Sequence, residues 1–336
     1  MNSFWKDKRV LVTGAGGITG QNIIRDLLKR GSKVRAIEGK TRKVNIDHPN
    51  LRVDSFDLLD YSSCLQATYK CDIVINCAAV IKGAKGQKTS QLQLVRENVN
   101  IGVNMITSAV QNNVKRFGFI GSSTMYPPVE MVYEYDGFKG DPWVGYLGVG
   151  NMKRYLEKVC QQFANESETQ FAIARTTALY GPFDDFNLET CHVIPALVNK
   201  ICHKQNPLEI WGDGSEERNF IYIDDFIDGF LEVIEHPAVS PVNIANREIS
   251  TVNDIIKYAT KYVGYDPDRN YDVTKPTMIP KRIVSVEKAK KYLGWEAKTS
   301  LKEGLQKTID WYRNNILYIE QQIENDQIAS DLPGKK

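Results

Sequence analysis

Several features that would mark whole classes of protein are missing from this 336-residue sequence. Its 43 basic and 41 acidic residues leave a net charge of +2, so it has no basic field of the kind that binds nucleic acid through phosphates. No apolar run approaches the ~20 residues that span a bilayer, which excludes a membrane protein. The six cysteines include no CxxC pair, so we expect neither a metal site nor a disulfide framework. The first residues lack the apolar segment of a secretion signal, and we expect a cytoplasmic protein.

What is present is an ordinary globular composition with alternating strand and helix patterns. Hydrophobic residues make up 42% and charged residues 25% of the chain, which fits one large domain or two modest ones. The β-branched runs predict buried strands at 9–14, 33–38, 51–57, 72–79, 116–123 and 171–176. Strands that alternate with helices pair in parallel, so we predict an α/β fold with a doubly wound parallel sheet of the Rossmann type.

The second half of the chain has more Pro, Trp, Asp and Gly and shorter elements. We predict a first domain over 1–180, into which the chain crosses again later, and a smaller α/β domain over 181–320. Amphipathic helices are expected near 224–236, 252–264 and 301–315. The last residues, 321–336, are predicted to form a frayed polar tail.

A glycine-rich loop, TGAGGITG, joins the first expected strand to the first expected helix. Gly14, Gly17 and Gly20 let the backbone approach a pyrophosphate closely, and Ile18 lies at the start of a helix whose free N–H groups can bind it. The strand–turn–helix context is the one that supports a dinucleotide site. We therefore predict that the first domain binds a nicotinamide cofactor; a purely structural turn is the alternative.

The end of the second strand bears on which nicotinamide cofactor is bound. Glu38 follows Gly20 by 18 residues (38 − 20), and its carboxylate can accept hydrogen bonds from a ribose 2′-hydroxyl while repelling a 2′-phosphate. This favours NAD over NADP. Lys40, Arg42 and Lys43 follow at once and could instead pair with that phosphate, although a solvated loop is the simpler interpretation.

Together with further motifs, these features make the chain similar to the extended short-chain dehydrogenase/reductases that modify nucleotide sugars. The resemblance covers nearly the whole chain. It rests on TGAGGITG, NCAAV (76–80), ENVNIGVNM (97–105), GSSTMYP (121–127), RTTALYGP (175–182), WGDGSEERNFIYIDDF (211–226) and KYLGW (291–295). Within the family, GPFDDFNLETCHVIPAL (181–197) is most similar to GDP-fucose synthase and its relatives on GDP-mannose-derived sugars.

The resemblance implies a two-domain fold that binds NAD, with NADP less favoured, and that holds a GDP-linked sugar in the smaller domain. It implies that Ala78, Ala79 and Lys153 line the cofactor site. Asp57 and Leu58, after the third strand, are candidates for contact with the adenine. A homodimer formed through a helix bundle is also implied, and the pairing of dimers into tetramers is left open.

Members of this family usually exchange a hydride between nicotinamide and a sugar carbon, and a tyrosine four residues before a lysine handles the proton. Lys153 matches that lysine, but Val149 occupies the tyrosine position. Tyr146 precedes Lys153 by seven residues, nearly two helical turns, and is a candidate proton relay; packing or a substrate contact is the alternative. His192 lies in the GDP-fucose synthase motif and is a second candidate, because imidazole exchanges protons near neutral pH.

The resemblance also implies residues that hold the substrate. Ser122 and Thr124, at the end of a strand, match the positions that hold the reacting sugar hydroxyl, and Tyr126 matches one near nicotinamide and sugar. Arg218 and Arg282 match positions that bind the diphosphate, which a guanidinium can bind bidentately. An ion pair of Arg218 with Asp224 or Asp225 is the alternative. The same pocket is expected to be lined by Trp211, Asn187 and Val193, the last within the stretch 191–195.

The positions at which the chain departs from the family pattern reduce the number of reactions that it is expected to catalyse. A dehydratase would carry an acidic pair where Met125 and Tyr126 stand. A reductase of the GDP-fucose synthase type that also epimerises C3 and C5 would use a cysteine where Thr124 stands, and NADPH, which Glu38 disfavours. A 4-epimerase needs the missing tyrosine. We therefore expect NAD-dependent oxidation of a GDP-linked hexose or heptose to its 4-keto form, a step suited to surface-polysaccharide sugars. A GDP-4-keto-sugar reductase or epimerase is one alternative, and a non-catalytic binder of nucleotide sugar or NAD is another.

Overall fold

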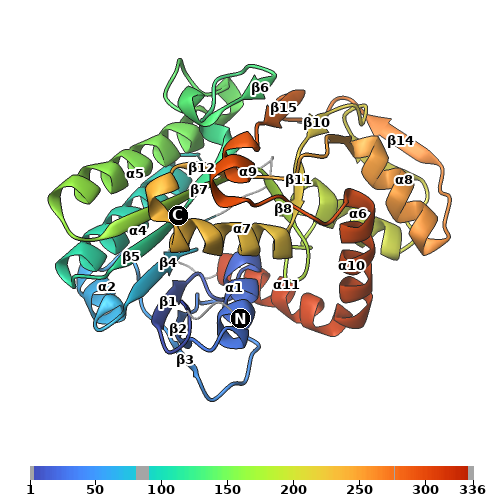
Figure 1. The fold of residues 1–336 in the computed structure, drawn as a ribbon. Coiled ribbons are helices and arrows are strands. Elements are labelled where there is room, and N and C mark those ends of the chain that lie inside the picture. Colours follow the sequence, from blue (N-terminus) through green and yellow to red (C-terminus); the bar gives the residue numbers. More distant parts are fainter. Residues whose placement is uncertain (1–3, 81–90, 276, 332–336) are drawn as a thin grey trace.

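The computed structural model describes residues 4–80, 91–275 and 277–331. These residues contain a parallel sheet of seven strands in the order β12-β7-β5-β4-β1-β2-β3. Each of these strands is labelled in Figure 1. The strands are β1 (Arg9–Thr13), β2 (Lys33–Ile37), β3 (Leu51–Asp54), β4 (Ile73–Asn76), β5 (Arg116–Ser122), β7 (Gln170–Thr176) and β12 (Val242–Ile244). The paired strands run parallel throughout, so the predicted doubly wound α/β fold is confirmed.

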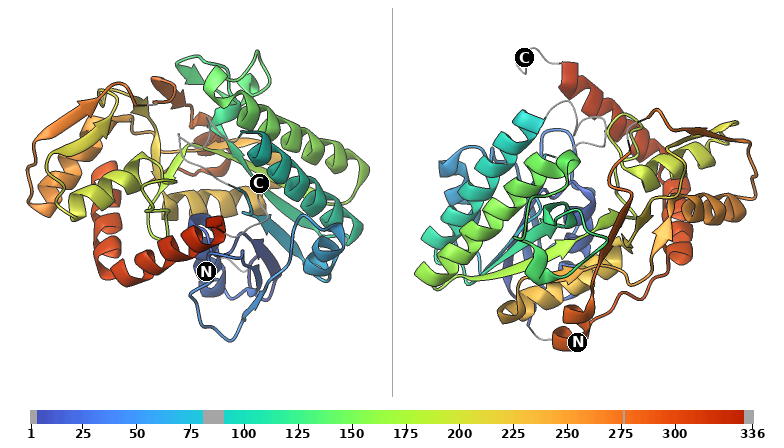
Figure 2. Two further views of the ribbon diagram at one scale, coloured as in Figure 1. Left: turned by 180° about the vertical axis from the view of Figure 1, so that it is seen from behind. Right: turned by 90° about the horizontal axis from the view of Figure 1, so that it is seen from above.

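Helices cover both faces of this sheet (Figure 2). One face packs against α1 (Ile18–Lys29) and α7 (Ile223–Glu235), and the other against α2 (Tyr61–Thr68), α4 (Gln91–Gln111) and α5 (Leu147–Glu166). In α1, Ile23, Ile24 and Leu27 share one face by their helical spacing and are fully buried. Both faces of the strands are therefore buried, as a parallel sheet requires.

The second half of the chain builds smaller sheets and helices beside the carboxyl ends of the main strands. One sheet pairs β13 (Ser250–Thr251), β10 (Glu217–Arg218), β15 (Lys281–Val284) and β6 (Met131–Val132). Two further pairs are β8 (Ala178–Tyr180) with β11 (Phe220–Tyr222), and β9 (Leu208–Trp211) with β14 (Arg269–Asp272). The helices are α6 (Val193–Cys202), α8 (Val252–Val263), α9 (Glu287–Leu293), α10 (Leu301–Asn314) and α11 (Ile316–Asp331). Short 3-10 turns are η1 (Ser123–Met125), η2 (Glu134–Asp136), η3 (Val144–Tyr146) and η4 (Pro237–Val239).

The chain returns to the main sheet after residue 180, because α7 covers one face and β12 pairs with β7. The domain limits at residues 180 and 320 remain predictions. The expected helices near 224–236, 252–264 and 301–315 are confirmed as α7, α8 and α10. The expectation of a frayed tail is wrong for 321–331, which continue α11; residues 332–336 lie outside the described part. Helix α11 is anchored to the protein through Ile319, which is buried in the main core.

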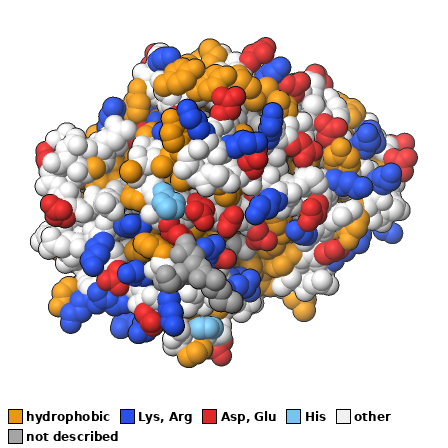
Figure 3. Space-filling view, viewed as in Figure 1, with side chains coloured by type: hydrophobic (Ala, Val, Ile, Leu, Met, Phe, Trp, Pro, Cys, Tyr) orange, Lys and Arg blue, Asp and Glu red, His pale blue; other side chains and the backbone are white. Residues whose placement is uncertain are grey.

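The surface of the molecule gives no sign of a single-sign charge field on the face drawn in Figure 3, where basic and acidic side chains are interspersed. Within the described residues, every helix is too short or too polar to cross a bilayer.

Candidate active site

The glycine-rich loop forms a backbone cradle between β1 and α1. Gly14 has a φ of +61°, and a Cβ there would lie 2.6 Å from the carbonyl carbon of Cys77, so the loop packs directly on the chain after β4. A Cβ on Gly17 would meet only the Gly14 carbonyl oxygen, at 3.5 Å, so this position opens outward. No side chain caps α1, whose first residue is Ile18, and its first N–H groups have no intrahelical partners. This cradle fits a pyrophosphate.

The chain ends of β1 and β4 are tied together beneath the cradle. The Thr13 hydroxyl donates to Asn76 Oδ1 at 2.6 Å, and the Ala78 N–H donates to Thr13 Oγ1 at 3.1 Å. Ala79 is exposed beside it. The predicted cofactor residues of the two loops, together with Gly20 in the first turn of α1, are thus brought to one edge of the sheet.

The residues after β2 and β3 have partners within the protein. Glu38 accepts from Lys43 Nζ at 2.9 Å and from the Val44 N–H at 3.0 Å. Asp57 accepts from the Leu59 N–H at 3.0 Å and shapes its own turn. Leu58 is buried against α2 and α4. Contact of these residues with an adenosine remains a prediction, and the Leu58 side chain does not face open space.

A polar cluster forms where β5 ends against α5. The Thr124 hydroxyl donates to Ser122 Oγ at 3.0 Å, and Ser122 Oγ also accepts from the Thr124 N–H at 3.2 Å. The ammonium of Lys153 on α5 donates a hydrogen bond to the Ile120 carbonyl oxygen at 2.9 Å. Burial lowers the pKa of Lys153 to about 8, and the Cys77 thiol opposes this shift. The structure therefore brings the three predicted residues Ser122, Thr124 and Lys153 to one place.

The position one turn before Lys153 offers no acid or base. Val149 lies on α5 and packs against the apolar core under the sheet. Tyr146 precedes the helix, at the end of η3, and its ring lies against Trp143 with centroids 5.2 Å apart. Burial raises the pKa of Tyr146, while the positive charges of Arg218 and Arg282 oppose that shift. Tyr146 is thus placed beside the predicted diphosphate residues.

Those two arginines lie on neighbouring strands of the smaller sheet, since Arg218 of β10 is opposite Arg282 of β15. Arg282 is 3% exposed; its Nη2 donates to the Tyr126 carbonyl oxygen at 3.4 Å, whereas its Nε and Nη1 atoms have no hydrogen-bond partner among the described residues. Burial, together with the nearby Arg218, lowers its pKa to about 10, and Tyr146 opposes the shift. Arg218 donates only to main-chain carbonyls, those of Glu217, Ile279 and Pro280, and within the described residues it forms no ion pair with Asp224 or Asp225. Two guanidinium groups with no ion-paired acid among the described residues make a site for an anion, although the Glu216 charge opposes the lowering of the Arg218 pKa.

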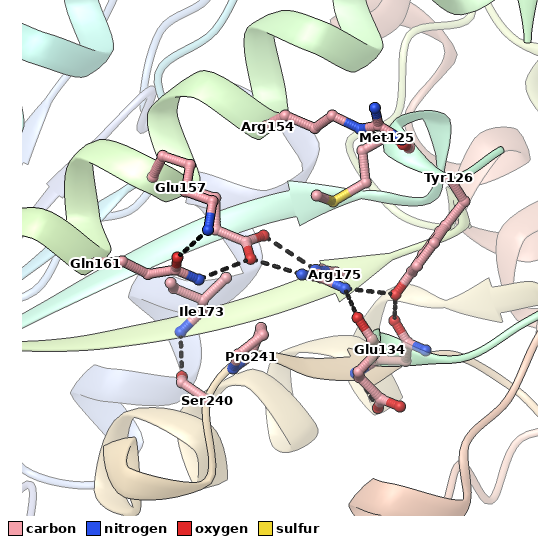
Figure 4. Close-up of polar contacts among 12 residues, drawn as sticks. Met125, Tyr126, Glu134, Arg154, Glu157, Gln161, Ile173, Arg175, Ser240 and Pro241 are labelled. Atoms are coloured by element: carbon pink, nitrogen blue, oxygen red, sulfur yellow. Dashed lines mark hydrogen bonds and ion pairs between the residues drawn. The ribbon is translucent and has the colours of Figure 1, made fainter. Parts of the chain in front are cut away.

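Tyr126, predicted to lie near nicotinamide and sugar, has its side chain in the protein interior, and its predicted role stays a prediction. It is fully buried, and its hydroxyl donates to Asn243 Oδ1 at 2.5 Å and accepts from Arg175 Nη1 at 2.9 Å (Figure 4). Burial raises its pKa to about 12. Its side chain therefore faces the interior, where Asn243 and Arg175 use both hydrogen-bonding capacities of the hydroxyl.

The remaining predicted residues border the loop that precedes α6. His192 is exposed at the helix start, where surrounding protein lowers its pKa and the Asp185 charge opposes the shift. Val193 is 38% exposed beside it. Asn187 is buried and accepts from the Glu189 N–H at 3.0 Å, so it shapes the loop. Trp211 ends β9, with Lys275 Nζ 5.7 Å from its ring centroid. No contact in the structure tests whether these four residues line one pocket.

The sequence analysis missed the network that supports this site. Arg175 on β7 binds Glu157 of α5 through two hydrogen bonds, of 2.6 and 3.0 Å, and both side chains are buried. Arg175 also donates to the Glu134 carbonyl at 2.6 Å (Figure 4). A signal was present, since Glu157 follows Lys153 by one helical turn and so puts a carboxylate on the sheet-facing side of α5.

Comparison with known proteins places the chain among relatives of similar length. A model of the "NAD dependent epimerase/dehydratase family" matches residues 10–245. GDP-L-fucose synthase 1 of Arabidopsis thaliana is 28% identical over 324 residues, which cover 93% of this chain and 95% of that protein. GDP-L-colitose synthase of Yersinia pseudotuberculosis is 27% identical over 317 residues, which cover 91% and 98%.

The fold is also found in solved structures. That of a GDP-6-OMe-4-keto-L-xylo-heptose reductase from C. jejuni matches with a TM-score of 0.80 and 22% identity, covering 94% of this chain and 99% of that one. At this identity the likeness shows the shared fold alone.

Proposed function

The chain belongs to the NAD-dependent epimerase/dehydratase family, as its motifs predicted, and from this we propose that it reduces a GDP-linked 4-keto hexose or heptose at C4 with NADH. When bound, the nicotinamide supplies the hydride. The protein holds the two ligands and provides the proton that converts the carbonyl oxygen into a hydroxyl.

The observation that carries the proposal is the buried guanidinium of Arg282, two of whose three nitrogens have no hydrogen-bond partner among the described residues. A buried arginine with two unused donors costs free energy, and a diphosphate would supply the missing acceptors and charge. Arg218, on the neighbouring strand, doubles the positive charge. Both the position and the charge of this pair suit the diphosphate of a nucleotide sugar.

Tyr146 is the proton donor that we assign for this reduction. Its phenol lies beside Arg218 and Arg282, and burial raises its pKa, so it carries the proton that the alkoxide needs. His192, at the exposed start of α6, is the alternative relay. Ser122 and Thr124 are proposed to hold the reacting oxygen.

The curated relatives favour this reductive function over the 4-dehydrogenase expected from the sequence. Both are named as synthases of GDP-linked sugars, GDP-L-fucose and GDP-L-colitose. Thr124 still argues against epimerisation at C3 and C5, because a threonine hydroxyl is a poor acid or base. We therefore propose C4 reduction with the C3 and C5 configurations retained.

The test is to mix purified protein with NADH and a GDP-linked 4-keto-6-deoxyhexose and to follow reduced-nicotinamide absorbance. The expected result is NADH consumption and a product whose C3 and C5 configurations are unchanged by NMR. The UDP-linked analogue is the matched control and should react much more slowly. NAD reduction with GDP-mannose, without NADH consumption by any GDP-4-keto sugar, would replace the reductase by the 4-dehydrogenase.

Val149 gives specific support to a second candidate, a non-catalytic binder of nucleotide sugar or NAD. Lys153→Met separates the two functions. In a reductase this change abolishes turnover, whereas in a binder it lowers only cofactor affinity. We also propose the homodimer implied by the family resemblance, which size-exclusion chromatography with light scattering would test.

A further inference from the structure

A loop that follows β2 folds over the glycine-rich loop. A Cβ on Gly16 would lie 2.1 Å from the Arg42 carbonyl oxygen, so only glycine lets the two loops approach this closely. Gln21 of α1 also donates to the Lys43 carbonyl, at 2.9 Å. Arg42 therefore lies where a dinucleotide's adenosine ribose meets the end of β2 in this kind of fold.

The Arg42 guanidinium is held by two acids from distant parts of the chain. Its Nη2 lies 2.9 Å from Asp185 Oδ1, in the loop after β8, and 3.1 Å from Asp326 Oδ2, on α11. The two carboxylates raise the pKa of Arg42 against the effect of burial. All three side chains are less than one-third exposed, so solvent screens these pairs only partly.

The helix that carries Asp326 is firmly seated. Ile319 is buried in the main core, and the Tyr318 ring lies 6.0 Å from that of Phe183. A small pocket remains between this helix, Gly16 and Arg42, and none of the predicted catalytic residues lines it. Figures 1 and 2 both show α11 running beside α1. A carboxylate on this helix is thus a fixed neighbour of Arg42.

The basic side chains of Arg42 and Lys43, in the loop after β2, are both paired with acids. Lys43 is paired with Glu38, and Arg42 is paired with Asp185 and Asp326. A 2′-phosphate carries nearly two negative charges at neutral pH and needs a guanidinium that is free to bind it. Here the arginine is neutralised and oriented toward other acids.

We propose that Asp326 is a specificity-determining residue: together with Asp185 it holds Arg42 away from the ribose 2′ position, and so the C-terminal helix selects NADH over NADPH. This inference rests on the proposed function, since it requires a nicotinamide dinucleotide in the glycine cradle. It assigns to α11 a role in cofactor choice that lies outside the strand–loop–helix motif itself.

The test measures the dissociation constants of NADH and NADPH by fluorescence titration, without any sugar substrate. Asp326→Asn should tighten NADPH binding about 5- to 10-fold, the equivalent of one ion pair, and change NADH binding less than twofold. Glu324→Gln is the matched control, because it removes an equal charge from the exposed side of the same helix. It should leave the ratio of the two constants unchanged.

A double variant shows whether Arg42 is the group released. Arg42→Gln in the Asp326→Asn background should cancel the gain in NADPH affinity. The inference is overturned if Asp326→Asn and Glu324→Gln change the ratio equally, or if the gain survives loss of Arg42. Wild-type protein that binds neither dinucleotide would overturn the proposed function as well, whereas normal NADH binding with an unchanged ratio overturns this inference alone.

Discussion

Two buried arginines in this protein have opposite surroundings. Arg175, between β7 and α5, is 1% exposed and meets the carboxylate of Glu157, so its pKa is raised. Arg282, on β15, is 3% exposed and has no acidic partner within the described residues, so its pKa falls to about 10. Both guanidinium groups lose hydration on burial. The carboxylate of Glu157 offsets that loss for Arg175, and no carboxylate among the described residues offsets it for Arg282. Only the second region needs a ligand to complete it.

Breaking the Arg175 region should have the largest effect. Glu157→Gln leaves a buried guanidinium without its counter-charge and is expected to lower the free energy of unfolding by about 3–5 kcal/mol. Urea unfolding followed by circular dichroism measures it. Glu166→Gln, at the exposed end of the same helix, is the control and should change stability by less than about 0.5 kcal/mol. A loss below about 1 kcal/mol for Glu157→Gln would show that the pair is not needed to balance Arg175.

In the Arg282 region, the phenol of Tyr146 is expected to matter for turnover and not for stability. Tyr146→Phe should lower kcat about 100- to 1000-fold, because the proton donor is lost, with GDP binding nearly unchanged. Tyr155→Phe, exposed on the neighbouring helix α5, is the control. If Tyr146→Phe kept full activity and His192→Asn lost it, the proton donor would be the His192 imidazole and not the Tyr146 phenol.

Removal of the Arg282 guanidinium tests this difference between the two arginines. Arg282→Met should weaken GDP binding about 10- to 100-fold, since charge-assisted hydrogen bonds to the diphosphate are lost. Unlike Glu157→Gln, it should not reduce the free energy of unfolding, because a buried cation with no acid in contact among the described residues is replaced by an apolar side chain. Calorimetric titration and urea unfolding measure the two effects, with exposed Arg247→Met as control. A large loss of stability would mean that the hydrogen bond from Arg282 Nη2 to the Tyr126 carbonyl oxygen stabilises the fold.

Lys153 is half-buried and pairs with no acid among the described residues, and its titration should show the effect. A lowered pKa means that the neutral amine accumulates as the pH rises through about 8. Acetylation of Lys153, followed by mass spectrometry, should therefore have its midpoint near pH 8, with exposed Lys302 as the reference lysine in the same samples. A Lys153 midpoint near the ordinary lysine value of about 10.4 would contradict the effect of burial.

The fold was predictable where local pattern decides it. Strand and helix periodicities predicted β1–β5 and β7 of the main sheet and the helices α7, α8 and α10, but not the edge strand β12, because each pattern reflects which face of one element is buried. The polar segment 321–331 was not predicted as helix. Its packing against the rest of the protein depends on the burial of Ile319 and on the contact of Asp326 with Arg42. These contacts join residues far apart in the chain.

The candidate site divides in the same way. Ser122, Thr124 and Lys153 were predicted to lie together, and the ends of β5 and α5 bring them there. The burial of Tyr126 was not predicted, because nothing local shows that Arg175 and Asn243 would enclose it.

The sequence by itself thus determined the alternation of strands and helices, the glycine cradle, and the absence of a phenol one turn before Lys153, since each depends on residues close together in the chain. Only the tertiary structure decided which charges are paired. Arg42 meets Asp326 across 284 positions, Arg175 meets Glu157 across 18, and Arg282 meets no acid within the described residues. Charge pairing depends on distances between elements that pack from separate parts of the chain, and no local pattern contains those distances.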